Sequence, residues 1–348
     1  MTVTKDVAIP KDSLVLVTGV TGFIGGNVAD QFLHYGYRVR GTTRNAAKAA
    51  WLSDLFEKRY GAGRFELVSV PDMAADGAFD DAAKGASAVA HVASDMSFDS
   101  NPNNVIPVVV AGAVSALKAA IAEPSVKRFV FTSSSSAAVN ASRTGPGVIV
   151  TEDTWNDASI REAWADPPYD GRSSAVYSAS KTSAEKEVWA LYKKARASRP
   201  DLVMSTVLPN VNFGRSLSVE VQGHPSTSAY PVLAWNGNAA AIEPLAAQYF
   251  VDVQDTARLH VAAATLPDVK EERIFAYAGK FNWDTVLDIL RAQNPDRQFM
   301  ENFHGGEDYN VIKPAARAEQ LLREMGRSGW TPLEDAIRAN TEDLRTAA

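Results

Sequence analysis

The chain of 348 residues contains no cysteine. This absence excludes disulfides, thiolate catalysis, and zinc or iron–sulfur sites built from cysteine. The five histidines are scattered and do not show a metal-ligand spacing such as His-Glu-x-x-His, which argues against a zinc enzyme. A chain without disulfides can fold in a reducing compartment, and we expect a cytoplasmic location.

The sequence also lacks an excess of basic charge. Lys and Arg number 35 against 41 Asp and Glu, which gives a net charge of −6 and disfavours binding to nucleic acid or to an anionic membrane surface. The first ten residues show no signal-peptide pattern. The longest apolar stretch, residues 105–122, is interrupted by Pro107 and Lys118 and predicts a core helix rather than a membrane span.

Hydrophobic residues make up 46% of the chain, enough for a large core, and the length is typical of about two domains. Short apolar strands alternate with helical patterns through the first half, which predicts an α/β fold with a doubly wound parallel Rossmann sheet and helices on both faces. The expected strands are apolar on both faces, as burial on both sides requires. They cover residues 14–18, 38–42, 65–70, 88–93, 128–133 and 204–208.

This alternation breaks after Pro209, where residues 210–249 are rich in Gly, Ser, Asn and Pro. Strand patterns return within 248–278, and the rest is mostly helical. The last helix has a start signal in Thr331, Pro332 and Glu334, which predicts a capping box. We therefore expect a cofactor-binding domain at 1–209, to which 250–278 returns, and a smaller substrate-binding domain at 210–249 and 279–348.

A glycine-rich turn connects the first strand to the first helix, the context in which such a turn binds a dinucleotide. Gly19 permits the tight turn, Gly22 lets the backbone approach a pyrophosphate, and Gly25 lets helix and strand pack closely. The helix N-terminus then presents free N–H groups to the phosphates. The candidate binding residues are Thr18, Gly19, Thr21, Gly22, Phe23, Ile24 and Gly25.

The residues after the second strand choose between the two nicotinamide cofactors. An NAD site expects an acidic residue about 20 residues after the glycines, and no acid occurs from Gln31 to Ser53. Arg40, Arg44 and Lys48 occur there instead and could bind a 2′-phosphate. The sequence thus predicts NADP(H), with Arg44 as the foremost ligand.

Tyr177 and Lys181 lie four residues apart at the start of an expected helix, on one face. Such a pair is common by chance, but this one follows the fifth strand. A phenol beside a cation can donate a proton to the alkoxide that forms when a carbonyl is reduced. Residues 132–136, Thr-Ser-Ser-Ser-Ser, follow that strand where open α/β sheets bind ligands, so Ser134 could bind the carbonyl oxygen.

With these motifs the chain resembles the extended short-chain dehydrogenase/reductase family over nearly its whole length. The segment 39–44, Val-Arg-Gly-Thr-Thr-Arg, resembles the branch of dihydroflavonol and cinnamoyl-CoA reductases, and within it the fungal and yeast NADPH-dependent aldehyde and carbonyl reductases. The resemblance implies a catalytic triad of Ser134, Tyr177 and Lys181. The catalytic serine stays open among residues 133–135, and the family's relay Asn has no counterpart in residues 108–112.

The resemblance also implies further cofactor contacts. Asp72 would bond the adenine amino group with Met73 beside it, and Lys181 would also hold the nicotinamide ribose. The remaining implied cofactor residues are Ala93, Ser94, Thr132, Pro209 and Val211.

A family-type substrate pocket would lie between the carboxyl ends of the strands and the smaller domain. Its expected walls are mostly apolar, which suits a small hydrophobic carbonyl substrate. The candidate wall residues are Met96, Phe98, Trp235, Leu245, Gln248 and Tyr249, with Val211 beside them.

We therefore expect NADPH-dependent reduction of aldehydes or ketones to alcohols by a monomer or homodimer. Two alternatives remain at this stage. One is an epimerase or dehydratase of nucleotide sugars that keeps its NAD bound, which the acid-free second strand disfavours. The other is a non-catalytic NADP(H) sensor, which the presence of both Tyr177 and Lys181 disfavours.

Overall fold

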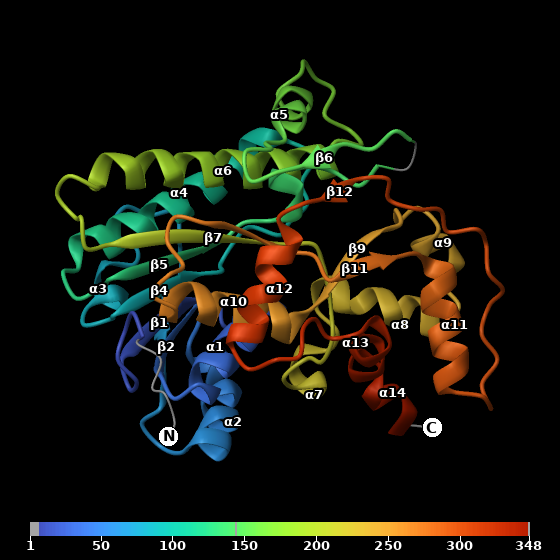
Figure 1. Cartoon of the computed structure of the whole chain (residues 1–348), viewed down its shortest axis with the longest axis horizontal. Helices are drawn as coiled ribbons and strands as arrows, with labels where there is room; N and C mark the ends of the chain where they lie inside the picture. Colours follow the sequence, from blue (N-terminus) through green and yellow to red (C-terminus); the bar gives the residue numbers. More distant parts are fainter. Residues whose placement is uncertain (1–6, 143–144, 347–348) are drawn as a thin grey trace.

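The computed structural model describes residues 7–142 and 145–346; the start of the expected first domain and the end of the second lie outside this range. A parallel sheet of seven strands forms the centre, in the order β10-β7-β5-β4-β1-β2-β3 (Figure 1). The strands are β1 (Leu14–Thr18), β2 (Arg38–Thr43), β3 (Phe65–Ser69), β4 (Ala88–His91), β5 (Arg128–Thr132), β7 (Val203–Pro209) and β10 (Arg273–Ala276).

Helices cover both faces of this sheet and form a hydrophobic core on each. One core joins Val15, Val17 and Val130 to α1, α2, α10 and α12, and the other joins Leu16, Phe129 and Phe131 to α3, α4 and α6. The helices are α1 (Phe23–His34), α2 (Ala50–Tyr60), α3 (Asp80–Ala83), α4 (Pro102–Ala122), α6 (Ser173–Ala195), α10 (Val253–Thr265) and α12 (Ala315–Glu324). The predicted fold class is confirmed.

A smaller lobe lies beyond the carboxyl ends of the central strands (Figure 1). It contains a three-stranded sheet, β11-β9-β8, and a hydrophobic core of its own. Its elements are β8 (Val211–Phe213), α7 (Val219–Gln222), α8 (Ala229–Trp235), α9 (Ala239–Ile242), β9 (Gln248–Asp252), β11 (Gly279–Phe281), α11 (Trp283–Gln293), α13 (Leu333–Asn340) and α14 (Glu342–Thr346). A ribbon of β6 (Ile149–Val150) and β12 (Val311–Ile312) and the short helix α5 (Asp157–Ala163) complete the structure, with 3₁₀ turns at Ala47–Ala49, Ser135–Ala137 and Ser226–Ser228.

Two local expectations are wrong. The expected smaller domain included α12, but its Ala318, Leu321 and Leu322 are buried in the core of the central sheet. The capping box does not form, because Pro332 precedes the first turn of α13 without a side-chain cap and the Thr331 N–H donates to Asp255. Distant contacts outweigh the local signal in both places.

The apolar helix α4 is long and apolar enough to cross a membrane by length and composition alone. In the structure it packs against α6, and Val105, Val109 and Leu117 are buried in the core between these helices and the sheet. The helix is therefore a core helix, as the interruption of its apolar stretch by Pro107 and Lys118 predicts.

Candidate active site

The glycine turn has the geometry that the sequence predicts. Gly19 has a φ of +70°, the left-handed region that favours glycine. A Cβ at Gly25 would lie 2.2 Å from the Gly19 carbonyl oxygen, so no larger residue fits between β1 and α1. Gly22 is exposed at the N-cap of α1, and its N–H donates to the Gly19 carbonyl oxygen. Thr21 is half-buried beside it, and Phe23 and Ile24 begin the helix.

Thr18 holds the neighbouring strand against this turn. Its hydroxyl accepts hydrogen bonds from the N–H groups of Val92 and Ala93, each at 2.9 Å, and lies 3.0 Å from Nδ1 of His91. Burial, followed by the charge of Lys181, lowers the pKa of His91 to about 3 and keeps the ring neutral. The Thr18 hydroxyl therefore ties the glycine turn to the backbone at the end of β4, and its hydrogen bonds are made within the protein.

The surroundings of the turn fit a dinucleotide. The turn is shaped by backbone that tolerates no Cβ at Gly25, and the N-terminus of the twelve-residue helix α1 opens onto it. Ser94, just after β4, has a buried hydroxyl oxygen without a hydrogen-bond partner among the described residues. A bound cofactor can supply the missing partner, since buried polar atoms are seldom left unpaired.

The three basic residues of the second strand region have different surroundings. The guanidinium of Arg40 donates to Glu66 at 2.6 Å and to the carbonyl oxygens of Ala82 and Lys84, which commits it to α3. The structure thus contradicts the prediction that Arg40 binds the 2′-phosphate. Arg44 and Lys48 are exposed after the end of β2.

Arg44 follows a strand end that is hydrogen-bonded to the glycine turn. The carbonyl oxygen of Thr42, two residues earlier, accepts hydrogen bonds from the N–H groups of Gly19 and Val20 at 3.0 and 3.1 Å. The end of β2 is therefore joined directly to the turn, and Arg44 is the basic residue best placed to meet a phosphate beside it.

The other cofactor candidates divide in the same way. Asp72 is exposed and accepts a hydrogen bond from the Ala74 N–H at 2.9 Å, and Met73 is half-buried against Gly112 of α4. Pro209 and Val211 are buried where β7 leads into β8. The hydroxyl of Thr132, in contrast, lies 2.7 Å from Nε2 of the buried His260, which turns it into the core and away from a cofactor.

The structure brings Ser134, Tyr177 and Lys181 together at the carboxyl end of β5. Burial raises the pKa of the Tyr177 phenol, and the nearby Ser134 hydroxyl opposes that rise. The Lys181 Nζ lies 5.9 Å from the centre of the Tyr177 ring. Tyr177 and Lys181 thus share one side of α6, as their four-residue spacing predicts, and the Ser134 hydroxyl approaches the phenol from the segment after β5.

The serine run has one hydroxyl facing the tyrosine. Ser133 donates to Glu185 at 2.7 Å, and Ser135 lies beside the buried hydroxyl of Tyr277. Ser134 alone among these three interacts with Tyr177, and its oxygen also accepts a bond from the Ser136 hydroxyl at 3.0 Å. This geometry favours Ser134 as the serine of the site.

Lys181 is only 4% exposed, and no carboxylate lies within ion-pair distance of it in residues 7–142 and 145–346. Burial alone lowers its pKa to about 8 from an ordinary value of 10.5. Below pH 8 the folded protein therefore holds a buried ammonium at a cost in stability.

This shift predicts a pH-dependent stability. Between pH 8 and pH 10.5 the unfolded chain binds more protons at Lys181 than the folded chain, so this residue's contribution to the free energy of unfolding rises with pH. We expect wild-type stability, relative to Lys181→Met, to rise by about 3 kcal/mol across that window, measured by urea unfolding. A relative stability that stays flat or falls would contradict the buried ammonium.

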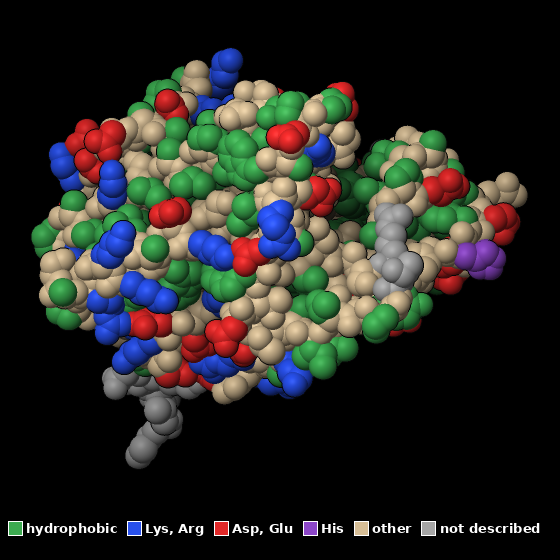
Figure 2. Space-filling model, turned by 90° about the horizontal axis from the view of Figure 1, so that it is seen from above, with side chains coloured by type: hydrophobic (Ala, Val, Ile, Leu, Met, Phe, Trp, Pro, Cys, Tyr) green, Lys and Arg blue, Asp and Glu red, His purple; other side chains and the backbone are tan. Residues whose placement is uncertain are grey.

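Two of the expected substrate residues border Tyr177 from the loop after β4. Phe98 is 49% exposed, and its ring stacks on Tyr177 with 5.1 Å between ring centres. Its φ of +53° is rare for a bulky residue, which marks a conformation imposed by the surrounding loop. Met96 is also exposed in this loop. Figure 2 shows a recess with hydrophobic side chains between the larger body and the smaller lobe.

The remaining expected walls have other partners among the described residues. Trp235 is buried in the core of the small lobe, against Phe299 and Arg297, so its prediction as a pocket wall is wrong. Tyr249 packs on Tyr277 and donates to the carbonyl oxygen of Asn310, and Gln248 bonds Ala246.

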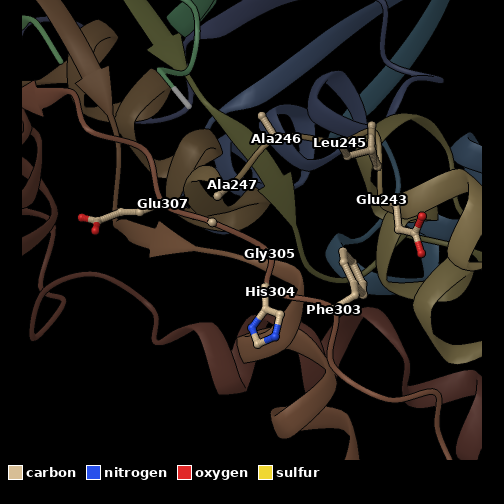
Figure 3. Close-up of a pocket in the computed structure, with 9 residues that line it drawn as sticks. Glu243, Leu245, Ala246, Ala247, Phe303, His304, Gly305 and Glu307 are labelled. Carbon is tan, nitrogen blue, oxygen red and sulfur yellow. The ribbon is translucent and has the colours of Figure 1, made fainter. Parts of the chain in front are cut away.

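Leu245 lines a separate cavity of about 480 Å³ in the small lobe (Figure 3). Ala246 and Ala247 continue this wall, and the loop with Phe303 and His304 faces it. The cavity is lined by none of the three triad residues.

Sequence reasoning missed Tyr230, on α8. Its charge when ionised would raise the pKa of Tyr177, so the two phenols lie near each other. The Tyr230 ring packs edge-to-face on Trp283, with 6.2 Å between ring centres. The Trp283 indole in turn donates to the Leu245 carbonyl oxygen at 3.2 Å. No sequence signal marked this residue, because it reaches the site from a segment with no regular pattern.

A glycine turn on a doubly wound sheet, with a Ser–Tyr–Lys group at the strand ends, defines a dinucleotide-binding protein of the extended short-chain dehydrogenase/reductase type. The chain belongs to the NAD dependent epimerase/dehydratase family, whose model matches residues 15–277. The resemblance inferred from the sequence is therefore confirmed.

Individual relatives cover almost the whole chain. It is 38% identical to aldehyde reductase 2 of Sporidiobolus salmonicolor, over 95% of each chain. It is also 38% identical to an Aspergillus terreus protein named NAD-dependent epimerase/dehydratase, over 97% of this chain and 98% of that one. The structure of Gre2 from Candida albicans in complex with NADPH matches with a TM-score of 0.80 and 26% identity, covering 97% of this chain and 99% of that chain.

Proposed function

We propose that this protein reduces aldehydes and ketones to alcohols with NADPH. The observation that carries the proposal is the grouping of Ser134, Tyr177 and Lys181 after β5, at the same edge of the parallel sheet as the glycine turn after β1. The names of the relatives support it, since one is an aldehyde reductase and a structural neighbour binds NADPH.

The chemistry follows from the properties of these side chains. Reduced NADP supplies the hydride when it is bound. The Tyr177 hydroxyl gives its proton to the carbonyl oxygen as the carbon–oxygen double bond becomes single, and Ser134 donates a hydrogen bond that orients that oxygen. The nearby Lys181 ammonium stabilises the phenolate that remains, against the burial that raises the pKa of Tyr177. Loss of absorbance at 340 nm that requires both NADPH and a carbonyl tests the proposal, and NADPH left unchanged beside every carbonyl supplied would contradict it.

The preference for NADP(H) rests on Arg44 and Lys48, which are exposed beyond β2, and on the acid-free segment before them. We expect Arg44→Gln to weaken NADPH binding about ten- to a hundredfold, because one charge-assisted phosphate contact is lost. NADH binding should stay unchanged. Titration of each cofactor by protein fluorescence measures both affinities.

Arg40→Gln is the matched control for this prediction. Its guanidinium is held by Glu66 and two carbonyl oxygens, so the variant should lose stability but keep the NADPH-to-NADH ratio. An unchanged ratio in Arg44→Gln, or a collapsed ratio in Arg40→Gln, would contradict the assignment.

The substrate side supports a small hydrophobic carbonyl compound. Phe98 and Tyr230 give the surroundings of Tyr177 aromatic character, and Met96 adds apolar surface. A division into a cofactor-binding part and the smaller lobe fits this arrangement, with α12 moved to the former. We further propose that the protein is a cytoplasmic monomer or homodimer. The net charge of −6 favours a protein that binds neither nucleic acid nor an anionic membrane.

An epimerase or dehydratase is the second candidate, because one relative carries that name. Such an enzyme regenerates its cofactor in each turnover, whereas a reductase consumes it. The two are separated by dialysing the protein and following NADPH during turnover. Cofactor retained through dialysis, with no net loss of NADPH, would favour the epimerase.

A further inference from the structure

Glu185 is a fully buried carboxylate outside the triad, on the same helix. Tyr177, Lys181 and Glu185 follow one another at four-residue steps along α6, so Glu185 lies about 12 Å down the helix from the tyrosine. A buried carboxylate is costly unless it is paired and hydrogen-bonded, and its bonds therefore show what it does.

The donors to Glu185 come from the residue after β5, from β7 and from β10, besides the Trp189 indole of α6 itself at 3.4 Å. The Ser133 hydroxyl donates to Oε2 at 2.7 Å, and the Thr206 hydroxyl of β7 donates to Oε1 at 2.8 Å. Arg273 of β10 donates from Nε at 2.8 Å and from Nη2 at 3.1 Å. This one carboxylate thus joins the helix that carries Tyr177 and Lys181 to β5, β7 and β10.

Arg273 is itself held firmly. Its Nη1 donates to the carbonyl oxygens of Glu152 and Thr154, at 2.6 and 2.8 Å, and its guanidinium stacks on Trp155 at 3.8 Å from the ring centre. The carboxylate therefore has a fixed cationic partner, and the position of Glu185 is set by the sheet rather than by solvent.

The hydrogen bond from Ser133 to Glu185 affects the direction in which the next side chain, Ser134, points. Ser134 is extended, with φ −156° and ψ 154°, and neighbouring side chains of an extended chain point to opposite sides. Because Ser133 is turned to Glu185, the next hydroxyl is turned elsewhere, and the Ser134 hydroxyl lies close enough to Tyr177 to lower the pKa of its phenol. The same bond ties the serine loop to the helix that carries the tyrosine.

We propose that Glu185 is a positioning residue that selects Ser134 from the serine run by holding the hydroxyl of Ser133. It touches neither the phenol nor a reacting atom in this arrangement, and it acts through Ser133. The proposal rests on the proposed reductase function, because it concerns the serine that binds the carbonyl oxygen.

Ser133→Ala and Thr206→Val form a matched pair to test it. Each removes one hydroxyl from the same carboxylate and leaves the Arg273 pair, so both should lower the free energy of unfolding by a similar amount. Only Ser133→Ala frees the serine loop. We expect it to lower kcat about tenfold, as for one weakened hydrogen bond in the transition state, while Thr206→Val stays within about twofold of wild type.

The pH profile separates positioning from a loss of folded protein. Tyr177 must be protonated to reduce a carbonyl, and the Ser134 hydroxyl lowers its pKa. Lys181, with a pKa of about 8, should set the first alkaline fall of kcat/KM in every variant. Weakening the Ser134 interaction in Ser133→Ala should move the second fall, which belongs to Tyr177, to higher pH, and Thr206→Val should leave both falls in place. The other titratable groups facing the phenol, Lys181 and Tyr230, are the same in both variants.

Three outcomes decide the matter. A tenfold loss with a shifted second fall in Ser133→Ala alone supports the proposal. Identical activity and pH profiles in the two variants would overturn it. A loss in Ser133→Ala as large as in Ser134→Ala would also overturn it, because Ser133 would then itself bind substrate. Failure of the reductase proposal is distinct, since wild-type protein would then leave NADPH unconsumed.

Discussion

Tyr177→Phe is expected to lower kcat for carbonyl reduction by about a thousandfold, within the range ascribed to a positioned general acid. The variant removes one oxygen, the proton donor, and keeps the ring that stacks on Phe98. NADPH affinity should stay within about threefold, because the glycine turn and Arg44 are untouched. Steady-state turnover at 340 nm and a fluorescence titration of NADPH measure the two effects separately.

Tyr192→Phe is the control on the same helix. Its hydroxyl bonds the Leu202 carbonyl oxygen and Glu271, at the end of α6 away from Tyr177. It should cost stability and leave kcat close to wild type. If Tyr177→Phe kept a tenth or more of the wild-type kcat, the proton would have to come from another group.

Gly25→Ala is expected to destroy cofactor binding together with much of the stability. The new methyl carbon would lie 2.2 Å from the Gly19 carbonyl oxygen and 2.8 Å from its carbon, so α1 must move away from β1. Overpacking of this kind costs about 1–3 kcal/mol or more. Urea unfolding and NADPH titration should therefore both show large losses.

Gly22→Ala tests the same turn without the clash. Its methyl carbon would lie 3.3 Å from the Gly19 oxygen, and the residue is exposed. Stability should change by only about 0.5 kcal/mol, as for a surface substitution. NADPH affinity should still fall, because the methyl group blocks close approach of the pyrophosphate to the backbone. Equal stability losses in both variants would contradict this account of the turn.

The central sheet and the glycine turn could be predicted because their signals are local. Strands such as Val15–Val17 are apolar on both faces, which parallel sheets covered by helices require. Gly19 precedes α1 and Gly25 lies in its first turn, at the spacing that a tight turn and close packing impose. The four-residue step from Tyr177 to Lys181 likewise survives in any helix.

Other features depend on contacts between distant segments. Arg40 and Arg44 are equally basic in sequence, but Arg40 is paired across the sheet with Glu66 and reaches α3, which only the strand register decides. Trp235 is aromatic like a pocket wall, yet it packs on Phe299, 64 positions later in the chain.

The selection of Ser134 also needed the structure. Glu185 follows Lys181 by four residues, so its place on α6 could be read from the sequence. Its partners could not, because Ser133 follows β5, while Thr206 and Arg273 lie in β7 and β10. Tyr230 likewise approaches Tyr177 from the small lobe, whose short helices lack a strong periodic pattern.

Transfer of deuterium from NADPH that carries deuterium at both C4 positions tests the central claim most directly. Wild-type protein is incubated with the labelled cofactor and an aromatic ketone, and the alcohol is examined by mass spectrometry. The account predicts one deuterium on the carbinol carbon for each NADPH consumed, with labelled alcohol formed about a thousandfold more slowly by Tyr177→Phe. Unlabelled alcohol, or labelled NADPH recovered unchanged beside unreduced ketone, would contradict it.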